Sequence, residues 1–268
     1  MSAGDAVHAP DSDDPSPVNM PDYTFARRPK WIAGHMIAIA AVLAFVLAGL
    51  WQVSRLSDRR AFNTTVAARS QGAPIPLPSM ATASDRTSDL EWQLVEFEAT
   101  WTGDEELLLQ AQSLGGLSGH DVLTPADVEG LTVVVDRGWV PIDVAGPPVE
   151  VAIPVANRVT VRGVLRTSQV RGTFGPTDPS AGPLGRVSRV DLPRIAPQLS
   201  GPVYPMWVQL LEQDPAQGEF PRIRPLPDLG EGPHLGYAVQ WFLFAGIVVV
   251  AYPILIRSTA RPSRRPSA

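Results

Sequence analysis

Two long apolar runs, one near each end of the chain, constrain the fold more than any other feature. They cover residues 31–51 and 235–256, and neither contains a formally charged side chain. As a helix, the first run spans roughly 31 Å, close to the hydrocarbon thickness of a bilayer. Tryptophan or tyrosine stands near the ends of both runs, as is common at membrane interfaces. The sequence therefore predicts two transmembrane helices, at 31–51 and 234–256.

Two other interpretations of these runs are less well supported. A cleaved signal peptide would not normally follow a polar tail as long as residues 1–30, and its apolar stretch would be shorter. A helix buried in the core of a soluble protein seldom continues so far without a charged residue. Uncleaved membrane anchors fit both runs better.

Basic residues at the C-terminus indicate the orientation of the chain. Four arginines follow the second run, while the acidic Asp228 and Glu231 precede it: Arg257, Arg261, Arg264 and Arg265. Positive loops stay on the cytoplasmic side, so the C-terminus is expected there. Two spans return both termini to one side. We expect a multi-pass protein of the cell membrane, with both termini cytoplasmic and the middle of the chain outside.

The remaining sequence divides into three parts. Residues 1–30, which begin with a stretch rich in Asp, Pro and Ser, predict a disordered cytoplasmic tail, and residues 257–268 predict a basic cytoplasmic tail. Residues 52–233 are long enough for a single extracytoplasmic domain with its own core. The helix leaving the membrane is expected to continue over residues 52–70.

The middle domain is expected to be mainly β. Short apolar or alternating stretches separated by Pro- and Gly-rich segments predict strands at residues 91–101, 105–111, 131–140, 159–167 and 204–211. Residues 171–185 predict a loop, and residues 191–199 a short helix with Asp191 near its N-cap. The fold class is therefore a membrane α + β protein whose two helices flank a mainly antiparallel barrel or sandwich.

The chemistry of common enzymes and nucleic-acid binders is absent from the sequence. No cysteine is present, which excludes disulfides, CxxC redox pairs and thiolate ligands, and the net charge of −5 comes without a basic stripe. Residues 116–120 resemble a nucleophile elbow, but His120 replaces its last glycine. A turn rich in Gly and Ser explains Ser118, His120 and Asp121 more simply. We expect no enzyme and no nucleic-acid partner.

One histidine stands out as a candidate metal or haem ligand. His234 opens the second apolar run at its outer end, and helical spacing places Tyr237, Ala238 and Trp241 on the same face. An imidazole above an aromatic stripe with a gap at Ala238 could receive a flat macrocycle. The same face could equally pack against another helix.

Two further polar residues lie within the apolar runs. His35 lies near the opposite membrane face, so His35 and His234 are too far apart to ligate one iron. Gln240 points away from the His234 face and is costly in lipid, so it is expected to face protein.

Three motifs, in order, resemble one known family. They are residues 49–55 (GLWQVSR), residues 135–141 (VDRGWVP) and residues 234–242 (HLGYAVQWF). Together they are similar to the signatures of the Surfeit locus protein one family of cytochrome c oxidase assembly factors. The likeness runs from about Trp31 to Arg257 with the same two-span layout. Arg59 stands where many members have lysine, and Gly232-Pro233 stand where an asparagine is common.

The resemblance implies a function and a set of site residues. Family members promote insertion of haem a into subunit I of the haem-copper oxidase, which makes that subunit and its assembly factors the expected partners, beside the lipid bilayer. His234 would be the haem ligand, with Tyr237 and Trp241 beside it. A docking subunit that never binds haem is the alternative. The other motif residues would serve partner or structural roles: Trp51, Gln52, Arg55, Arg137, Gly138, Trp139 and Gln240.

Arg137 and Trp139 allow two interpretations. On the structural one, Trp139 is part of the core, Arg137 pairs with a carboxylate, and Gly138 marks a bulge or tight packing. On the functional one, both side chains face the oxidase or the haem. The position of Gly138 beside a bulky tryptophan favours the structural interpretation.

Overall fold

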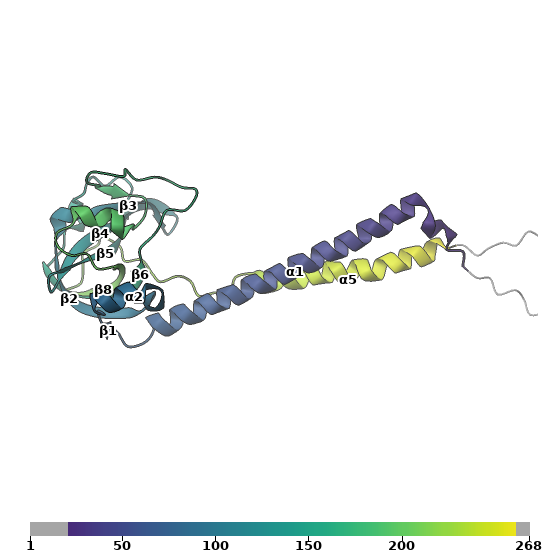
Figure 1. The fold of residues 1–268 in the computed structure, drawn as a ribbon, viewed down its shortest axis with the longest axis horizontal. Coiled ribbons are helices and arrows are strands. Elements are labelled where there is room, and N and C mark those ends of the chain that lie inside the picture. Colours follow the sequence, from purple (N-terminus) through teal and green to yellow (C-terminus); the bar gives the residue numbers. More distant parts are fainter. Residues whose placement is uncertain (1–20, 261–268) are drawn as a thin grey trace, which may run out of the picture. The chain divides into compact units, whose positions relative to one another are not determined.

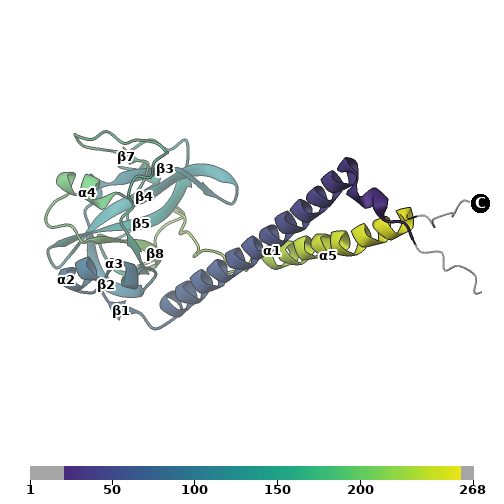
Figure 2. The ribbon, with the colours of Figure 1, turned by 45° about the vertical axis from the view of Figure 1, so that its right-hand side comes forward.

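The computed structural model describes residues 21–260, which form two compact units. One unit contains the chain up to Arg59 together with the chain from Glu231 onward, and the other contains Arg60–Gly230. Each unit has its own secondary structure, and we treat them separately. Figures 1 and 2 show the elements of both.

Two long helices make up the first unit. Helix α1 covers Pro29–Ser70 and helix α5 covers His234–Thr259. Both are long and apolar enough to cross a membrane, and only 6% of each apolar window is buried. That exposure differs from the core helix of a soluble protein and is compatible with a membrane protein that carries a middle domain. The last part of α1, from Arg60 to Ser70, belongs to the second unit, and the helical continuation predicted for residues 52–70 is confirmed.

The two helices run antiparallel, side by side, in both views (Figures 1 and 2). The less exposed positions of α1 include a series that recurs alternately every four and three residues: Trp31, His35, Ala38, Val42, Phe45, Gly49 and Gln52. This spacing keeps one face of a helix against a neighbour, as in coiled-coil packing. On α5 the matching positions are His234, Ala238, Trp241 and Ala245. At Gly49 an added Cβ would lie 2.6 Å from the Phe242 ring, so the small residue permits the close approach.

The ends of this unit differ from the sequence prediction in two places. Thr24–Arg27 form a 3-10 helix within the tail that was predicted to be disordered over residues 1–30. The Phe25 and Trp31 rings, with centroids 4.8 Å apart, tie that turn to α1, which explains the order. Helix α5 continues to Thr259, three residues past the predicted end. The rest of the predicted tails, 1–20 and 261–268, lies outside the described residues.

The second unit is built on one eight-stranded sheet, whose order is β1-β2-β6-β8-β5-β4-β3-β7. Its strands are β1 (Ile75–Pro76), β2 (Leu94–Trp101), β3 (Leu107–Leu114), β4 (Leu117–Val128), β5 (Leu131–Pro141), β6 (Arg158–Thr167), β7 (Arg186–Val187) and β8 (Met206–Asp214). Short helices lie between them: α2 (Met80–Asp85), α3 (Thr87–Leu90) and α4 (Leu192–Ile195). Single 3-10 turns cover Gly103–Glu105, Glu150–Ala152 and Ala196–Gln198.

The sheet is mainly antiparallel, as predicted, but it is mixed because three short pairings are parallel. The long pairings are antiparallel, but β1–β2, β3–β7 and β5–β8 are parallel. The parallel partners are joined by segments long enough to return the chain to the same end of the sheet. An additional antiparallel pairing joins β2 to β4 over only two residue pairs.

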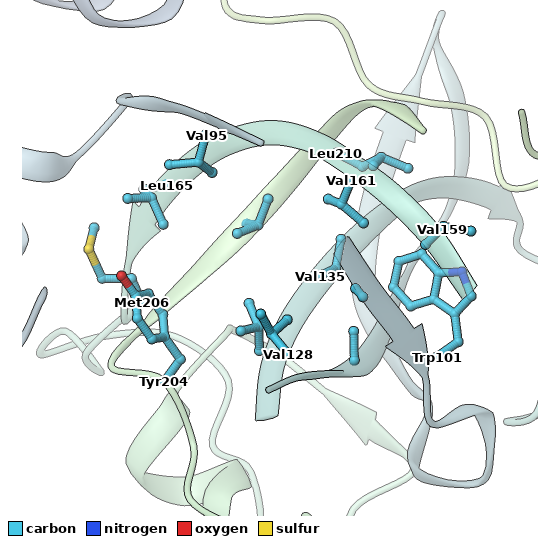
Figure 3. Close-up of a cluster of buried hydrophobic side chains, with 14 of the residues drawn as sticks. Val95, Trp101, Val128, Val135, Val159, Val161, Leu165, Tyr204, Met206 and Leu210 are labelled. Atoms are coloured by element: carbon cyan, nitrogen blue, oxygen red, sulfur yellow. The ribbon is translucent and has the colours of Figure 1, made fainter. Parts of the chain in front are cut away.

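The main core of this unit is rich in valine. Val95, Val135 and Val161 are fully buried, and Figure 3 shows their side chains converging with those of Trp101, Leu165, Tyr204 and Met206. Val134, between two residues of this cluster, packs into a second cluster with Leu107 and Leu123. Since both faces of β5 are covered, the strand has a continuous apolar run instead of an alternating one.

All five predicted strands are present with shifted ends, but the long strand β4 and the two-residue strands β1 and β7 are missing from the prediction. Residues 116–121 were expected to be a turn, whereas the turn is confined to Gly115 and Gly116, which have positive φ. Gly119 lies inside β4, and an added Cβ there would meet the Val140 carbonyl oxygen at 2.1 Å. Gly119 is therefore required for close packing. In the sequence, such a glycine cannot be told apart from one that marks a turn. The predicted loop at 171–185 and the helix capped by Asp191 are confirmed.

Candidate functional site

The first side chain of α5 is held by a residue of α1. His234 Nδ1 lies 2.9 Å from Gln52 Oε1, and the Gln52 side chain is 9% exposed. An amide oxygen can only accept, so Nδ1 carries the proton and donates. The proton-free Nε2 then has a lone pair for a metal or a donor.

The surroundings of that nitrogen are open on the side of Gly232. This residue has φ +70°, and a Cβ built on it would lie 3.7 Å from His234 Nε2. Glycine is thus favoured there by the backbone, and its missing side chain leaves this edge of the imidazole uncovered. His234 itself is half-buried.

The residues that follow His234 on the predicted helix face differ in exposure. Trp241 stacks on Phe45 of α1, with ring centroids 5.8 Å apart, and Ala238 is 2% exposed. Tyr237, at the edge of that face, is 48% exposed. The position of Ala238 is therefore covered by helix packing, because the small side chain lets the helices approach. Of the two alternatives, the structure favours the packed helix over the slot for a macrocycle between the helices.

Three other motif residues lie on exposed faces. Gln240 is exposed, so the protein contact expected for it is not supplied by α1. Trp51 is 55% exposed, with the Arg55 guanidinium 5.7 Å from its ring centroid. Arg55 also pairs with Asp58 at 3.7 Å, in an exposed contact of little energetic value.

A second polar contact joins the helices near their other ends, and sequence reasoning missed it. The Tyr252 hydroxyl donates to His35 Nδ1 at 2.6 Å, while His35 Nε2 donates to the Ala26 carbonyl oxygen at 3.2 Å. At 1.5 Å per residue, His35 is about 25 Å along α1 from Gln52, which contacts His234. The two histidines therefore lie near opposite ends of the helix pair, as the sequence predicted. His35 has both nitrogens occupied and is not available as His234 is. The alternating spacing of Trp31, His35 and Ala38 places His35 on the face of α1 that packs against α5, and this signal could have predicted its contact with that helix.

Arg137 lies in the interior of the second unit, with a side chain that is 0% exposed. Its Nη1 donates to the Ala152 carbonyl oxygen at 2.7 Å and lies 3.9 Å from a Glu106 carboxylate oxygen. The guanidinium also lies 5.3 Å from the Trp101 ring centroid. Burial lowers the pKa of Arg137 to about 10, which still leaves it charged at neutral pH.

Glu106 completes this buried pair and was not singled out in the sequence. It accepts from the Val149 N–H at 2.8 Å and from the Thr124 hydroxyl at 3.2 Å. Burial raises the pKa of its carboxyl group, while these donors and Arg137 oppose the rise. The structural interpretation of Arg137, as the partner of a carboxylate, agrees with this geometry.

Gly138 and Trp139 agree with the structural interpretation too. The register of β4 on β5 shifts between Val122 and Leu123, so that Arg137 is the extra residue of a bulge. Gly138 has φ +121°, and a Cβ there would lie 2.2 Å from the Arg222 carbonyl oxygen. Trp139 is 2% exposed. Neither Arg137 nor Trp139 therefore offers a side chain to a partner.

A polar cavity of about 340 Å³ lies beside the same strands. Asp121 and Asp136 line it, and Arg224 pairs with Asp121 at 2.6 Å. Burial, reinforced by the neighbouring Asp121, raises the pKa of Asp136 to about 8, while its Oδ1 accepts from the Gly138 N–H at 2.9 Å. Asp136 is thus largely protonated at neutral pH. No signal in the sequence set it apart from the other scattered carboxylates.

Within residues 21–260, no group of three or more His, Asp or Glu residues could hold a metal ion. In the three motifs, all of which lie within those residues, His234 is the one histidine.

Comparison with known proteins adds the family. Residues 38–246 match the SURF1 family, a range that begins inside α1 and ends inside α5. An uncharacterised SURF1-like protein of Mycobacterium tuberculosis is 25% identical over 257 residues, which cover 93% of this chain and 92% of that protein. Surfeit locus protein 1 of Xenopus tropicalis is 30% identical over 170 residues, covering 56% of this chain and 52% of that protein. The human Surfeit locus protein 1 is 26% identical over 158 residues, covering 53% and 51%. The match spans both helices and the sheet between them, and the chain belongs to the SURF1 family.

Proposed function

We propose that this protein is a membrane-bound assembly factor for haem-copper cytochrome c oxidase that aids insertion of haem a into subunit I. The SURF1 family is known generally for cytochrome oxidase assembly, and the match extends from within α1 to within α5. The observation that carries the haem step is the contact between His234 and Gln52, which leaves Nε2 proton-free.

His234 would hold a haem through a single bond from its Nε2 to the iron. Gln52 fixes the orientation and tautomer of the His234 ring, as partners of ligating histidines commonly do. The haem would supply the iron that accepts the bond. Ala238 is covered by helix packing, so the ligand face lies on the outer side of the helix pair, near the exposed Tyr237. A site with one protein ligand and an open side suits a group that is passed on rather than retained.

The same proposal includes the membrane topology. Both long helices would cross the cell membrane, with the two termini cytoplasmic and residues 60–230 outside. The arginines after α5 support this orientation. The chain has no cysteine, so a single one can be labelled in intact cells. We expect a membrane-impermeant maleimide to label Ser118→Cys and to miss Ser263→Cys; the reverse pattern would overturn the orientation.

The haem step is tested by spectroscopy of the full chain purified from cells that make haem a. We expect the wild type to show a Soret band, His234→Gly to lose it, and added imidazole to restore it by filling the vacated space. His35→Phe is the matched control at the far end of the helix pair and should retain the band. A band that survives in His234→Gly would reject His234 as the ligand.

Gln52→Ala sharpens this test. If Gln52 orients the imidazole, the variant should bind haem a roughly 10- to 100-fold more weakly while His234 is still present. Haem affinity equal to that of the wild type would show that the contact serves only helix packing.

A docking subunit that binds no haem is the second candidate. It is favoured by the filled gap at Ala238, which removes the slot between the helices that a macrocycle could have entered. Stable co-purification with the oxidase, without any haem in the isolated protein, would support this alternative over the first. Neither function involves covalent chemistry by this chain, and we propose that it is not an enzyme.

A further inference from the structure

The segment between β5 and β6 exposes a row of apolar side chains. Val151, Ile153 and Val155 are 55%, 64% and 64% exposed. Ala152, between the first two, is 0% exposed, and Val149 is 1% exposed. Val149 and Ala152 thus face inward, whereas Val151, Ile153 and Val155, close together in the chain, are exposed to solvent. We call residues 149–155 the apolar ridge.

Buried polar contacts hold the ridge in place. The Val149 N–H donates to Glu106, which directly precedes β3, and the Ala152 carbonyl oxygen accepts from Arg137 of β5. Both contacts lie on the inner side of the segment. The backbone that carries Val151 and Ile153 is therefore attached to two charged side chains in the interior of the unit.

Apolar packing supports the same segment from below. Val149 and Ala152 belong to a buried cluster with Leu108, Val122 and Val140 of the sheet. A surface that is already ordered loses little conformational entropy when a partner binds, so its apolar area is available for affinity. Soluble surfaces rarely leave grouped apolar side chains uncovered without a binding role.

The charge around the ridge indicates what kind of partner fits. Residues 138–157 contain two acidic side chains, Asp143 and Glu150, and no lysine or arginine, and the exposed Arg158 that follows is paired with Glu98. Both acidic residues are exposed. Such a surface is repelled by anionic lipid headgroups and attracts basic side chains at the rim of an interface.

We propose that the apolar ridge docks a polypeptide that presents apolar residues flanked by lysine or arginine. Val151, Ile153 and Val155 supply the apolar contact, and Asp143 and Glu150 supply the complementary rim. The inference rests on the proposed function only in expecting this polypeptide to be part of the oxidase or its assembly machinery.

A second exposed apolar site provides a control. Val170 and Phe174 are 87% and 91% exposed, in a segment that has no regular secondary structure and includes Arg171. Among the described residues, the nearest charged pair along the chain is Arg189 with Asp178, which is partly exposed and lies beyond Phe174, whereas Glu106 and Arg137 bind the ridge itself. It therefore tests whether exposure alone is enough for binding.

The experiment places a photo-reactive benzoylphenylalanine at Ile153, or at Phe174 as control, in the full-length protein in native membranes. We expect Ile153 to cross-link to a peptide that is apolar and bears flanking basic residues, with a yield at least fivefold above that at Phe174. The yield should fall severalfold when Asp143→Asn and Glu150→Gln are added. Cross-links to lipid, to a second copy of this chain or to a peptide without basic residues would overturn the proposal, as would equal yields at the two sites.

Affinity provides an independent readout. Val151→Ser, Ile153→Ser and Val155→Ser together should weaken association with the cross-linked partner at least tenfold, whereas Val170→Ser with Phe174→Ser should not. Unchanged association in the triple variant would overturn the proposal that the apolar ridge binds this partner. If wild-type protein does not associate with the oxidase at all, the proposed function fails, and the ridge then stands only if the peptide cross-linked at Ile153 has the stated apolar and basic composition.

Discussion

The helix pair and the β unit treat buried polar groups in opposite ways. Between the helices, one contact near each end joins a histidine to a tyrosine or an amide, His35 to Tyr252 and His234 to Gln52. In the β unit, charged Arg137 lies in the interior beside Glu106, and Asp136 is kept largely protonated. The helices satisfy their backbones internally and need few side-chain contacts. The sheet unit has a bulge and long connecting segments, whose backbone groups are satisfied by buried side chains.

The contacts between the helices share one register. From Phe45 to Gln52 on α1, and from His234 to Trp241 on α5, the chain advances by the same number of residues. The polar contacts near the two ends and the stacked rings between them therefore belong to a single antiparallel alignment. In a pair held mainly by apolar packing, such contacts define which residues meet.

The largest effect should come from the buried charge in the β unit. Arg137→Met leaves Glu106 buried without its cation and removes the donor to Ala152, so we expect a loss of about 3–5 kcal/mol in the free energy of unfolding. Denaturant unfolding of the full chain in detergent, followed by tryptophan fluorescence, measures it. Arg158→Met is the control: its exposed pair with Glu98 should matter by less than about 0.5 kcal/mol. Similar losses in both variants would mean that burial of Arg137 is energetically unimportant.

A smaller effect is expected between the helices. Gly49→Leu would drive a side chain into the Phe242 ring and separate α1 from α5, at a cost of about 1–3 kcal/mol. Cysteines placed at Ala38 and Val248, which line one cleft, report the separation through the yield of disulfide cross-linking. We expect a lower yield with Gly49→Leu and no change with Gly246→Leu, which has open space around it. Equal yields would argue against the close approach.

The effect that is smallest over a single pH unit is the change of stability with pH. Because the pKa of Asp136 is raised from 3.8 to about 8 in the folded protein, the folded state binds the extra proton between these values. The free energy of unfolding should therefore fall as pH rises through this window, by at most about 1.4 kcal/mol per pH unit. Asp136→Asn keeps an acceptor for the Gly138 N–H and should flatten the curve, whereas the exposed Asp143→Asn should not. If the free energy of unfolding of Asp136→Asn still falls with pH in the same way, the pH dependence comes from another titratable group.

Much of the architecture was predictable because it depends on local patterns. Apolar runs without charges gave the long helices, and alternating or β-branched stretches gave five strands within a few residues. The long strand that was missed, β4, shows the limit of this reasoning: Gly119 is required by the neighbouring Val140 and Trp139, which a sequence cannot place beside it. The parallel pairings are likewise long-range and leave no local trace.

The site was predicted only in part. His234 and Gln52 were both singled out, but their contact joins residues at opposite ends of the chain and no local spacing predicts it. The sequence left open whether Ala238 opens a gap or packs against a helix, because helical spacing shows which residues share a face and not what covers that face. Glu106 was missed since its importance comes entirely from Arg137 and from the Val149 N–H that it meets.

By itself, the sequence determined the two apolar helices, the β character of the segment between them and the motifs of the SURF1 family. These features follow from residue composition and periodicity, which act over a few turns or strands. Only the tertiary structure decided that Arg137 is an interior residue, that Gln52 orients His234, and that Val151, Ile153 and Val155 form an exposed row. Burial and hydrogen bonding depend on contacts between residues far apart in the chain, and those contacts exist only once the sheet and the helix pair have assembled.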